Sequence, residues 1–310
     1  MVGQMFLKVL SEREIKADYT LFASSKNAGK IIDFMGKAHT VRELTEDSPK
    51  SQKFDFALFS AGGSVSEKFA PLFAKTGCVV IDNSSHFRMH PGVPLVVPEV
   101  NPKAAKANKG IIANPNCSTI QAVVALYPLK KAFGLKRVIY STYQAVSGAG
   151  LAGTADLIHN TANKFPHRIA GNILPHIDAF LPSGYTKEEQ KMIDETKKIL
   201  GDNGIKVTAT TARVPVYNAH SESINVEFER PCTLSDVYQA LRLQPGLKLR
   251  DEPRKNLYPT PLKADGKDWV YVGRVRIDDT VPSGINMWVV ADNLRKGAAT
   301  NAVQILQLLL

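Results

Sequence analysis

Short, continuous apolar segments separated by helical patterns constrain the fold of this chain more than any other feature. Four of them lie in the first third, at residues 19–24 (YTLFAS), 54–61 (FDFALFSA), 78–84 (CVVIDNS) and 110–114 (GIIAN). Such runs are typical of strands buried on both faces, and helices between them imply a parallel sheet covered on both sides. The sequence therefore predicts an α/β, doubly wound domain that binds its ligands at the carboxyl ends of the strands.

The beginning of the chain lacks a part that a dinucleotide-binding domain of this kind normally has. Such a domain opens with a strand and a glycine-rich turn into a helix, whose N-terminal amides hold the pyrophosphate. Here residues 5–14 (MFLKVLSERE) already form an amphipathic pattern, and only Val2 and Gly3 remain where the turn should be. We therefore expect a chain truncated at its N-terminus, without the first strand and most of the glycine turn.

From about residue 118 the pattern changes. A predicted helix over 118–133 and an amphipathic helix over 187–200 accompany segments in which apolar and polar residues alternate. Such alternation is typical of a half-exposed, largely antiparallel sheet backed by helices. A last helix, from about Lys296 to Leu310, should return to pack on the first domain. The alternating segments are 137–148, 207–216, 223–230, 269–277 and 285–293.

Composition excludes several classes of function. The net charge is +10, but the sequence has no Lys/Arg block and no zinc-finger spacing, so we expect no nucleic-acid partner. A positive field suits an anionic small molecule. No apolar run approaches the ~20 residues that span a bilayer, and no signal peptide is visible. Three widely spaced cysteines form no metal-ligand set and indicate reduced thiols in the cytoplasm.

Cys117, in IIANPNCSTIQ, is the residue whose context most suggests chemistry. It follows a strand and an Asn-Pro-Asn turn and stands at the start of a helix, where the helix dipole and free amides should lower the pKa of a thiol. The alternative is a buried structural cysteine. Polar residues at other strand ends favour a site: Gln144 precedes a Ser-Gly-Ala-Gly loop, and a hairpin with its turn at 217–219 should bring Arg213 and His220 together.

Taken together, these motifs resemble those of the aspartate-β-semialdehyde dehydrogenases, most closely the form found in Gram-positive and many other bacteria. The resemblance runs in family order over almost the whole chain, and NPNCST combined with QAVSGAG is its most specific part. It implies a Rossmann-type cofactor domain formed by residues 1–116 and 292–310, and a catalytic and dimerisation domain over 117–291. The matching segments are 59–66, 79–89, 94–101, 111–121, 141–150, 174–180, 184–192, 195–199, 213–223 and 292–299.

The resemblance also implies roles for individual residues. Cys117 is similar to the family's nucleophile, His220 to an acid/base with a pKa near neutrality, and Gln144 to the residue that orients the acyl intermediate. Arg213 matches the residue that grips the substrate carboxylate, as a guanidinium fork suits a planar anion. The other expected substrate-binding residues are Glu188 for the amino group, Lys191 and Arg88 for the phosphate, and Asn116 beside the nucleophile.

The expected cofactor is NADP. A site that reads an NAD ribose usually carries an acidic residue after the second strand, whereas Ser25, Lys26 and Asn27 are polar or basic and suit a 2′-phosphate. No metal is expected. The remaining predicted cofactor-binding residues are Val2, Gly3, Ser60, Ala61, Gly62, Gly63, Ser147, Gly148 and Asn293.

The predicted activity is NADPH-dependent reduction of L-aspartyl-4-phosphate to L-aspartate-4-semialdehyde and phosphate through a Cys117 thioester, in the biosynthesis of lysine, methionine, threonine and diaminopimelate. The resemblance implies a cytoplasmic homodimer. Two alternatives remain. One is a cysteine-dependent hydrolase or acyltransferase that uses Cys117 and His220 without a nicotinamide. The other is an inactive fragment of the dehydrogenase.

Overall fold

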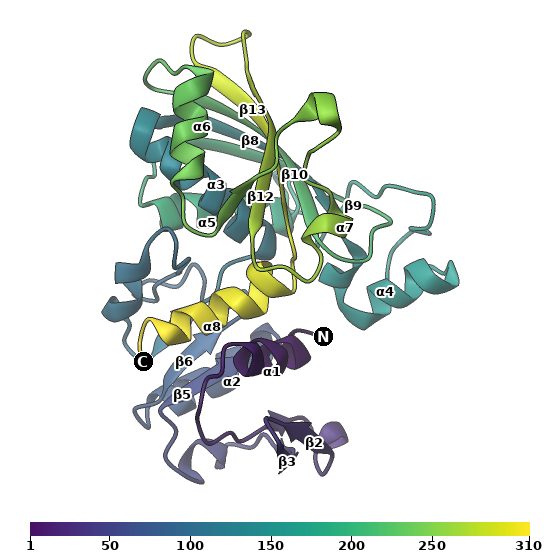
Figure 1. Ribbon diagram of the computed structural model, residues 1–310. Helices are drawn as coiled ribbons and strands as arrows, with labels where there is room; N and C mark the ends of the chain where they lie inside the picture. The colour runs from purple at the N-terminus through teal and green to yellow at the C-terminus, as the bar shows by residue number, and fades with distance from the viewer.

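The computed structural model describes all residues, 1–310, and Figure 1 shows two parts stacked one above the other. The upper part holds a six-stranded sheet and the lower part a smaller parallel sheet, with the C-terminal helix lying between them. None of the helices is both long and apolar enough to cross a membrane. The helices are α1 (Val2–Glu12), α2 (Gly63–Ala74), α3 (Cys117–Phe133), α4 (Gly150–His159), α5 (Lys187–Leu200), α6 (Leu234–Arg242), α7 (Pro261–Ala264) and α8 (Thr300–Gln307), which follows a π turn at Arg295–Ala299.

The smaller part contains the parallel sheet that the sequence predicts. Its strands β5 (Phe56–Phe59), β6 (Val79–Asp82) and β7 (Ile111–Ala113) are parallel in that order. Both faces are covered, because Ile81 and Ile112 pack with residues of α1 and α8, whereas Val80 packs with Phe73 of α2. This accounts for the continuous apolar character of the strands.

The region 19–24 differs from the prediction. Only β1 (Phe22–Ala23) is a strand, and it pairs with β4 (Arg42–Glu43) rather than with the three-stranded sheet. Both strands have only two residues, so this pairing is short. Between them β2 (Ile31–Phe34) and β3 (Lys37–Thr40) form a separate antiparallel hairpin that the sequence analysis did not predict.

The larger sheet has the order β11-β12-β13-β10-β8-β9. The three central pairings are antiparallel, whereas β8 with β9 and β11 with β12 are parallel, so the sheet is mixed but mostly antiparallel. Helices α3, α5 and α6 contribute to the same apolar cluster as these strands. The strands are β8 (Leu135–Gln144), β9 (Lys206–Arg213), β10 (His220–Phe228), β11 (Leu247–Leu249), β12 (Val270–Ile277) and β13 (Gly284–Ala291).

The predicted hairpin between Arg213 and His220 is wrong. These residues end β9 and begin β10, but β8 lies between the two strands and pairs with both. Since β8 runs parallel to β9 and antiparallel to β10, the end of β9 and the start of β10 still lie at one edge of the sheet, beside Gln144 at the end of β8. The three polar side chains therefore meet by a non-local route.

Candidate active site

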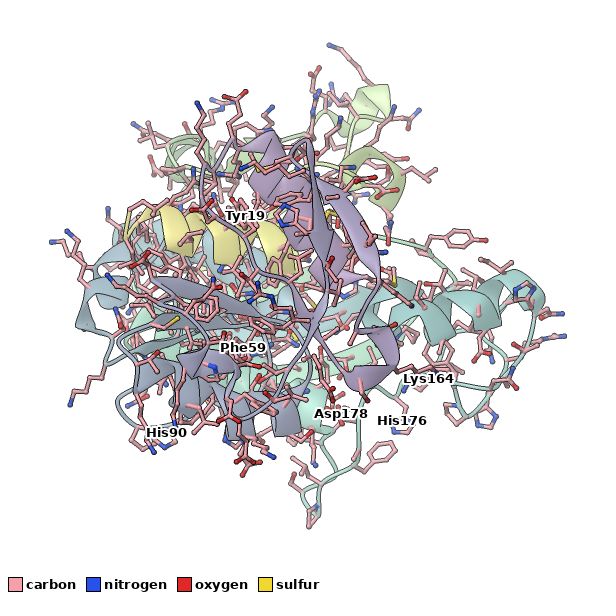
Figure 2. The ribbon with its side chains drawn as sticks, turned by 90° about the horizontal axis from the view of Figure 1, so that it is seen from below. Tyr19, Phe59, His90, Lys164, His176 and Asp178 are labelled. Atoms are coloured by element: carbon pink, nitrogen blue, oxygen red, sulfur yellow. The ribbon has the colours of Figure 1, made fainter.

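A cavity of about 680 Å³ contains most of the predicted catalytic residues. Its walls include Cys117, Gln144 and Arg213, with Glu188 and Lys191 from α5. A segment that the sequence analysis did not assign to the site also contributes Lys164, His176 and Asp178. Figure 2 shows these three residues at the same side of the molecule, away from His90. The site is thus formed by α3, α5, strand ends of the large sheet and the segment that follows α4.

Cys117 is the first residue of α3, as predicted, and its helix is capped. The side-chain oxygen of Asn116 accepts hydrogen bonds from the backbone amides of Ser118 (3.0 Å) and Thr119 (3.3 Å). An asparagine N-cap stabilises a helix by about 1 kcal/mol and holds the first turn in place. Asn116 therefore positions Cys117 through the backbone as well as lining the cavity.

The expected lowering of the Cys117 pKa is wrong. Burial and the nearby Glu188 carboxylate raise the pKa of the thiol to about 12. Arg213, Arg88 and the backbone amide of Ser118 act in the opposite direction but are outweighed. A position at a helix N-terminus lowers a thiol pKa only when desolvation is small. At Cys117 the desolvation is large, so the side chain is a neutral thiol.

His220 is completely buried and held by a backbone group. Its Nδ1 accepts a hydrogen bond from the amide of Ala145 at 3.0 Å, and its Nε2 has no partner. An amide can only donate, so Nδ1 is the unprotonated nitrogen and Nε2 carries the hydrogen. Burial and the neighbouring Arg213 lower the His220 pKa well below its ordinary value, so the expected pKa near neutrality is also wrong.

Gly148 lies beside both Arg213 and His220, and its lack of a side chain leaves room for both of them. A Cβ added at Gly148 would meet Arg213 Nη1 at 2.8 Å and His220 Nε2 at 3.3 Å. Arg213 donates through Nη1 to the carbonyl oxygen of Ala145 at 2.7 Å, and burial lowers its pKa. The glycine of the loop after β8 thus serves close packing of the catalytic groups, besides the cofactor contact predicted for it.

Glu188 joins several of the predicted residues. Its Oε1 accepts hydrogen bonds from Asn116 Nδ2 (2.9 Å) and Gln144 Nε2 (3.2 Å). Lys191 lies one turn further along α5, 3.4 Å from Glu188 Oε2, and forms a shorter pair with Asp178 at 2.7 Å. The Glu188 carboxylate therefore holds the two amides and the lysine in one connected group.

Glu195 is a buried residue beside the site that the sequence analysis did not assign to it. It is fully buried, accepts a hydrogen bond from the backbone amide of Asn116 at 2.7 Å, and pairs with Arg88 Nη1 at 3.1 Å. Arg88 also donates to the carbonyl oxygens of Asn114 (3.0 Å) and Asn83 (3.0 Å). The spacing of Glu188, Lys191 and Glu195 on α5 is i, i+3, i+7, which places them on one face and could have revealed Glu195.

The predicted cofactor residues fall into two groups. Val2, Ser147, Gly148 and Asn293 line the cavity, and Asn293 Nδ2 donates to Ser147 Oγ at 2.9 Å. Asn293 Oδ1 also accepts from the amide of Ala219 at 2.9 Å, which fixes the loop before His220. The cavity does not reach the other predicted residues, which are exposed or half-buried: Gly3, Ser25, Lys26, Asn27, Ser60, Ala61, Gly62 and Gly63.

The π turn is a second feature that the sequence analysis missed. Gly297 lies so close to Cys117 that an added Cβ would be 2.9 Å from Cys117 Cβ and 3.4 Å from its Cα. π turns are rare and frequently occur at functional sites. This one places Leu294, Gly297 and Ala298 in the cavity wall beside Val2.

Comparison with known proteins identifies the family. Residues 1–108 match the model described as "Semialdehyde dehydrogenase, NAD binding domain", and residues 126–296 match "Semialdehyde dehydrogenase, dimerisation domain". The aspartate-semialdehyde dehydrogenase of Aquifex aeolicus is 54% identical over 322 residues, covering 99% of this chain and 94% of the relative.

Solved structures agree with these matches. The Vibrio cholerae aspartate semialdehyde dehydrogenase II complexed with ASA has a TM-score of 0.93 and 48% identity, covering 99% of this chain and 94% of that one. The Candida albicans enzyme with NADP has a TM-score of 0.79 and 28% identity, with 99% and 95% covered. These matches do not support the expected N-terminal truncation. The chain belongs to the aspartate-semialdehyde dehydrogenase family and is an enzyme of that class.

Proposed function

We propose that the protein reduces L-aspartyl-4-phosphate to L-aspartate-4-semialdehyde and phosphate, with Cys117 as the nucleophile. The observation that supports this most strongly is the arrangement of Cys117, Gln144, Arg213 and Glu188 around one cavity, with His220 behind it. A thiol, a carboxylate, a guanidinium and an imidazole together suit a small substrate that has an ammonium group, a carboxylate and an activated acyl group.

Substrate binding uses the charges of the site. The guanidinium of Arg213 faces the cavity and suits the substrate carboxylate, while Glu188 suits the ammonium group. Arg88 and Lys191 supply positive charge for the phosphate. The Vibrio cholerae relative, which is complexed with ASA, supports a small-molecule substrate site in a protein of this fold.

In the first step, the Cys117 sulfur attacks the acyl carbon and the carbon–oxygen bond to phosphate breaks. The thiol proton leaves with the phosphate, so the products are a Cys117 thioester and hydrogen phosphate. This route suits a cysteine whose pKa is raised by burial and by the Glu188 carboxylate. An ammonium group bound at Glu188 would also cancel the negative charge that opposes the thiolate.

In the second step, a hydride adds to the thioester carbon and the carbon–sulfur bond breaks to release the aldehyde. The Cys117 sulfur leaves with the bonding electron pair as a thiolate and takes up one proton from solvent, which restores the thiol. His220 presents an N–H at Nε2, so its role is to donate a hydrogen bond to the carbonyl oxygen as negative charge develops there. Gln144, held by Glu188, orients the acyl group. A nicotinamide cofactor, when bound, supplies the hydride.

The residues at one side of the cavity fit a nicotinamide cofactor. Val2 stands at the N-terminus of α1, and the first turn of this helix has no acidic residue and no side-chain cap, so its amides are free for an anion. Val2, Ser147 and Asn293 would hold the nicotinamide half near Cys117. Lys26, which is exposed after β1, would meet a 2′-phosphate, and the NADP complex of the Candida albicans relative supports this choice.

We further propose that residues 1–116 and 292–310 form the cofactor domain and 117–291 the catalytic domain, and that the protein is a cytoplasmic homodimer. The contacts of α8 with α1 and β6 support the first division. Helices cover one face of the large sheet, while Tyr143 and Trp288 contact each other on the other face, with their ring centroids 5.4 Å apart and their ring planes tilted by 44°. This uncovered aromatic face, within the region matched to a dimerisation domain, supports the dimer.

The test is semialdehyde oxidation followed at the nicotinamide absorbance band. The proposal predicts an absorbance change that requires NADP, semialdehyde and either phosphate or arsenate together. Substrate turnover without NADP would instead support a cysteine hydrolase or acyltransferase. A protein without activity and without a cooperative melting transition raised by NADP would be the inactive fragment.

A further inference from the structure

Glu222 is a buried carboxyl group for which the proposed reaction has no use. It lies on β10, two residues after His220, and is completely inaccessible to solvent. Neither of its carboxyl oxygens has a hydrogen-bond partner, and no lysine or arginine forms an ion pair with it. Buried carboxyl groups are normally paired, so a bare one beside a catalytic histidine requires an explanation.

The groups that face Glu222 belong to the first turn of the helix that carries the nucleophile. Side chains alternate along a strand, so Glu222 and His220 lie on the same face of β10, against which α3 packs. Ser118 and Gln121 of α3 are its nearest polar neighbours. Ser118 Oγ and Gln121 Oε1 are themselves buried and without partners, while Gln121 Nε2 is 3.4 Å from the carbonyl oxygen of His220.

The charges around Glu222 favour its neutral form. Burial raises its pKa well above the ordinary value, and the carboxylate of Glu188 on α5 acts in the same direction. Tyr140, from the neighbouring strand β8, is uncharged because its own pKa is raised by burial. His220, on the same strand, is held neutral. An ionised carboxylate without a cation is so costly in the interior that the group takes up a proton instead.

We propose that Glu222 is a positioning residue: as a neutral carboxylic acid it links Ser118 and Gln121 of α3 to β10, and so fixes Cys117 relative to His220. An acid group has one O–H to donate and one carbonyl oxygen to accept, which matches a cluster that contains a hydroxyl and an amide. The inference deepens the proposed function and rests on it, because it assumes that Cys117 and His220 act on the same substrate.

The test compares Glu222→Gln, which keeps the shape and stays neutral, with Glu222→Ala. We expect Glu222→Gln to keep kcat within about twofold near neutral pH, whereas Glu222→Ala lowers kcat by about tenfold or more with little change in KM. At alkaline pH, ionisation of Glu222 adds a negative charge beside the first turn of α3. Activity of the natural protein should therefore fall there, and Glu222→Gln should remove that fall. Glu227→Gln, on the same strand but paired with Lys136, is the control and should change neither kcat nor the pH profile.

Three results would overturn the proposal: a Glu222→Gln variant as impaired as Glu222→Ala, an unimpaired Glu222→Ala, or identical alkaline profiles for the natural protein and Glu222→Gln. Melting curves and the rate of Cys117 alkylation by iodoacetamide are read for each variant. These two readouts need no turnover. A failure of the dehydrogenase reaction in the natural protein would therefore be distinguished from a failure of the role of Glu222.

Discussion

The backbone amide of Ala145 donates a 3.0 Å hydrogen bond to Nδ1 of His220, and this contact leaves the Nε2 hydrogen without a partner. The same Ala145 accepts from Arg213 through its carbonyl oxygen at 2.7 Å. The backbone of one residue, Ala145, therefore holds both the imidazole and the guanidinium in place. The histidine is prepared to donate, not to accept, a hydrogen bond.

Replacing His220 should consequently lower the rate of chemistry more than it lowers substrate affinity. The substitution His220→Asn removes Nε2, the ring nitrogen that points away from Ala145. We expect kcat to fall by about 10²- to 10⁴-fold with a smaller change in KM, the range typical of a positioned proton-donating group. Steady-state kinetics of semialdehyde oxidation measure both. His159→Asn, at the exposed end of α4, is the control, and equal losses in the two variants would contradict the role of His220.

The stability of the protein should fall as the pH decreases below about 6.5, the value for an unfolded histidine. Because the pKa of His220 is lowered in the folded protein, the unfolded chain binds a proton in this range that the folded chain does not. Glu222 acts in the opposite sense, since its raised pKa makes stability fall as pH rises above about 4.3. Urea unfolding at stepped pH should show a shallower acid loss for His220→Asn. Parallel curves of unfolding free energy against pH for the two proteins would show that His220 does not contribute to the acid loss of stability.

Glu195 should be important for stability because it holds two groups at once. Glu195→Gln keeps the shape but leaves Arg88 without its buried counter-ion and turns an amide N–H toward a donor. Breaking a buried ion pair from one side destabilises a protein by about 3 kcal/mol or more. Urea unfolding measures this, and Glu252→Gln, in the exposed pair with Lys255, should leave it unchanged. A Glu195→Gln variant as stable as the natural protein would contradict the account.

An added methyl group at Gly297 should disturb Cys117 directly. The Cβ of Gly297→Ala would be 2.9 Å from Cys117 Cβ, and neither the π turn nor the capped start of α3 can give way easily. We expect a change in the iodoacetamide alkylation rate of Cys117 of about fivefold or more, since displacement by even ~1 Å affects reactivity strongly. In Gly3→Ala the added Cβ meets nothing within 4 Å, so that variant should alkylate like the natural protein. Equal rates in all three would refute the contact.

Local signals allowed some elements to be predicted with accurate bounds. Helix α5 coincides with the predicted range 187–200 because its ends are marked in the sequence. Thr186 and Glu189 form a capping box, and Gly201 ends the helix in a left-handed conformation. The start of α3 lies one residue before the predicted range 118–133, directly after the Asn-Pro-Asn turn, where Asn116 caps the helix. Where a few neighbouring residues mark the end of a helix, the bounds of that helix can be predicted from the sequence.

Features that depend on distant residues were not predictable in this way. β10 begins at His220, earlier than the alternating pattern indicated, because it pairs with β8 on one side and β13 on the other. The hairpin failed for the same reason, since β8 is inserted between its two strands. The pKa of Cys117 is set largely by burial and by a carboxylate from another helix, neither of which the NPNCST motif contains.

The most direct test of the central claim is the rate of semialdehyde oxidation by Cys117→Ser in the presence of NADP and phosphate. A hydroxyl is a far weaker nucleophile than a thiol and cannot form the thioester through which the reaction divides. We predict a loss of about 10³-fold or more in kcat, with the melting temperature retained. A Cys117→Ser variant that oxidises the semialdehyde at nearly the natural rate would contradict the assignment of Cys117 as the nucleophile.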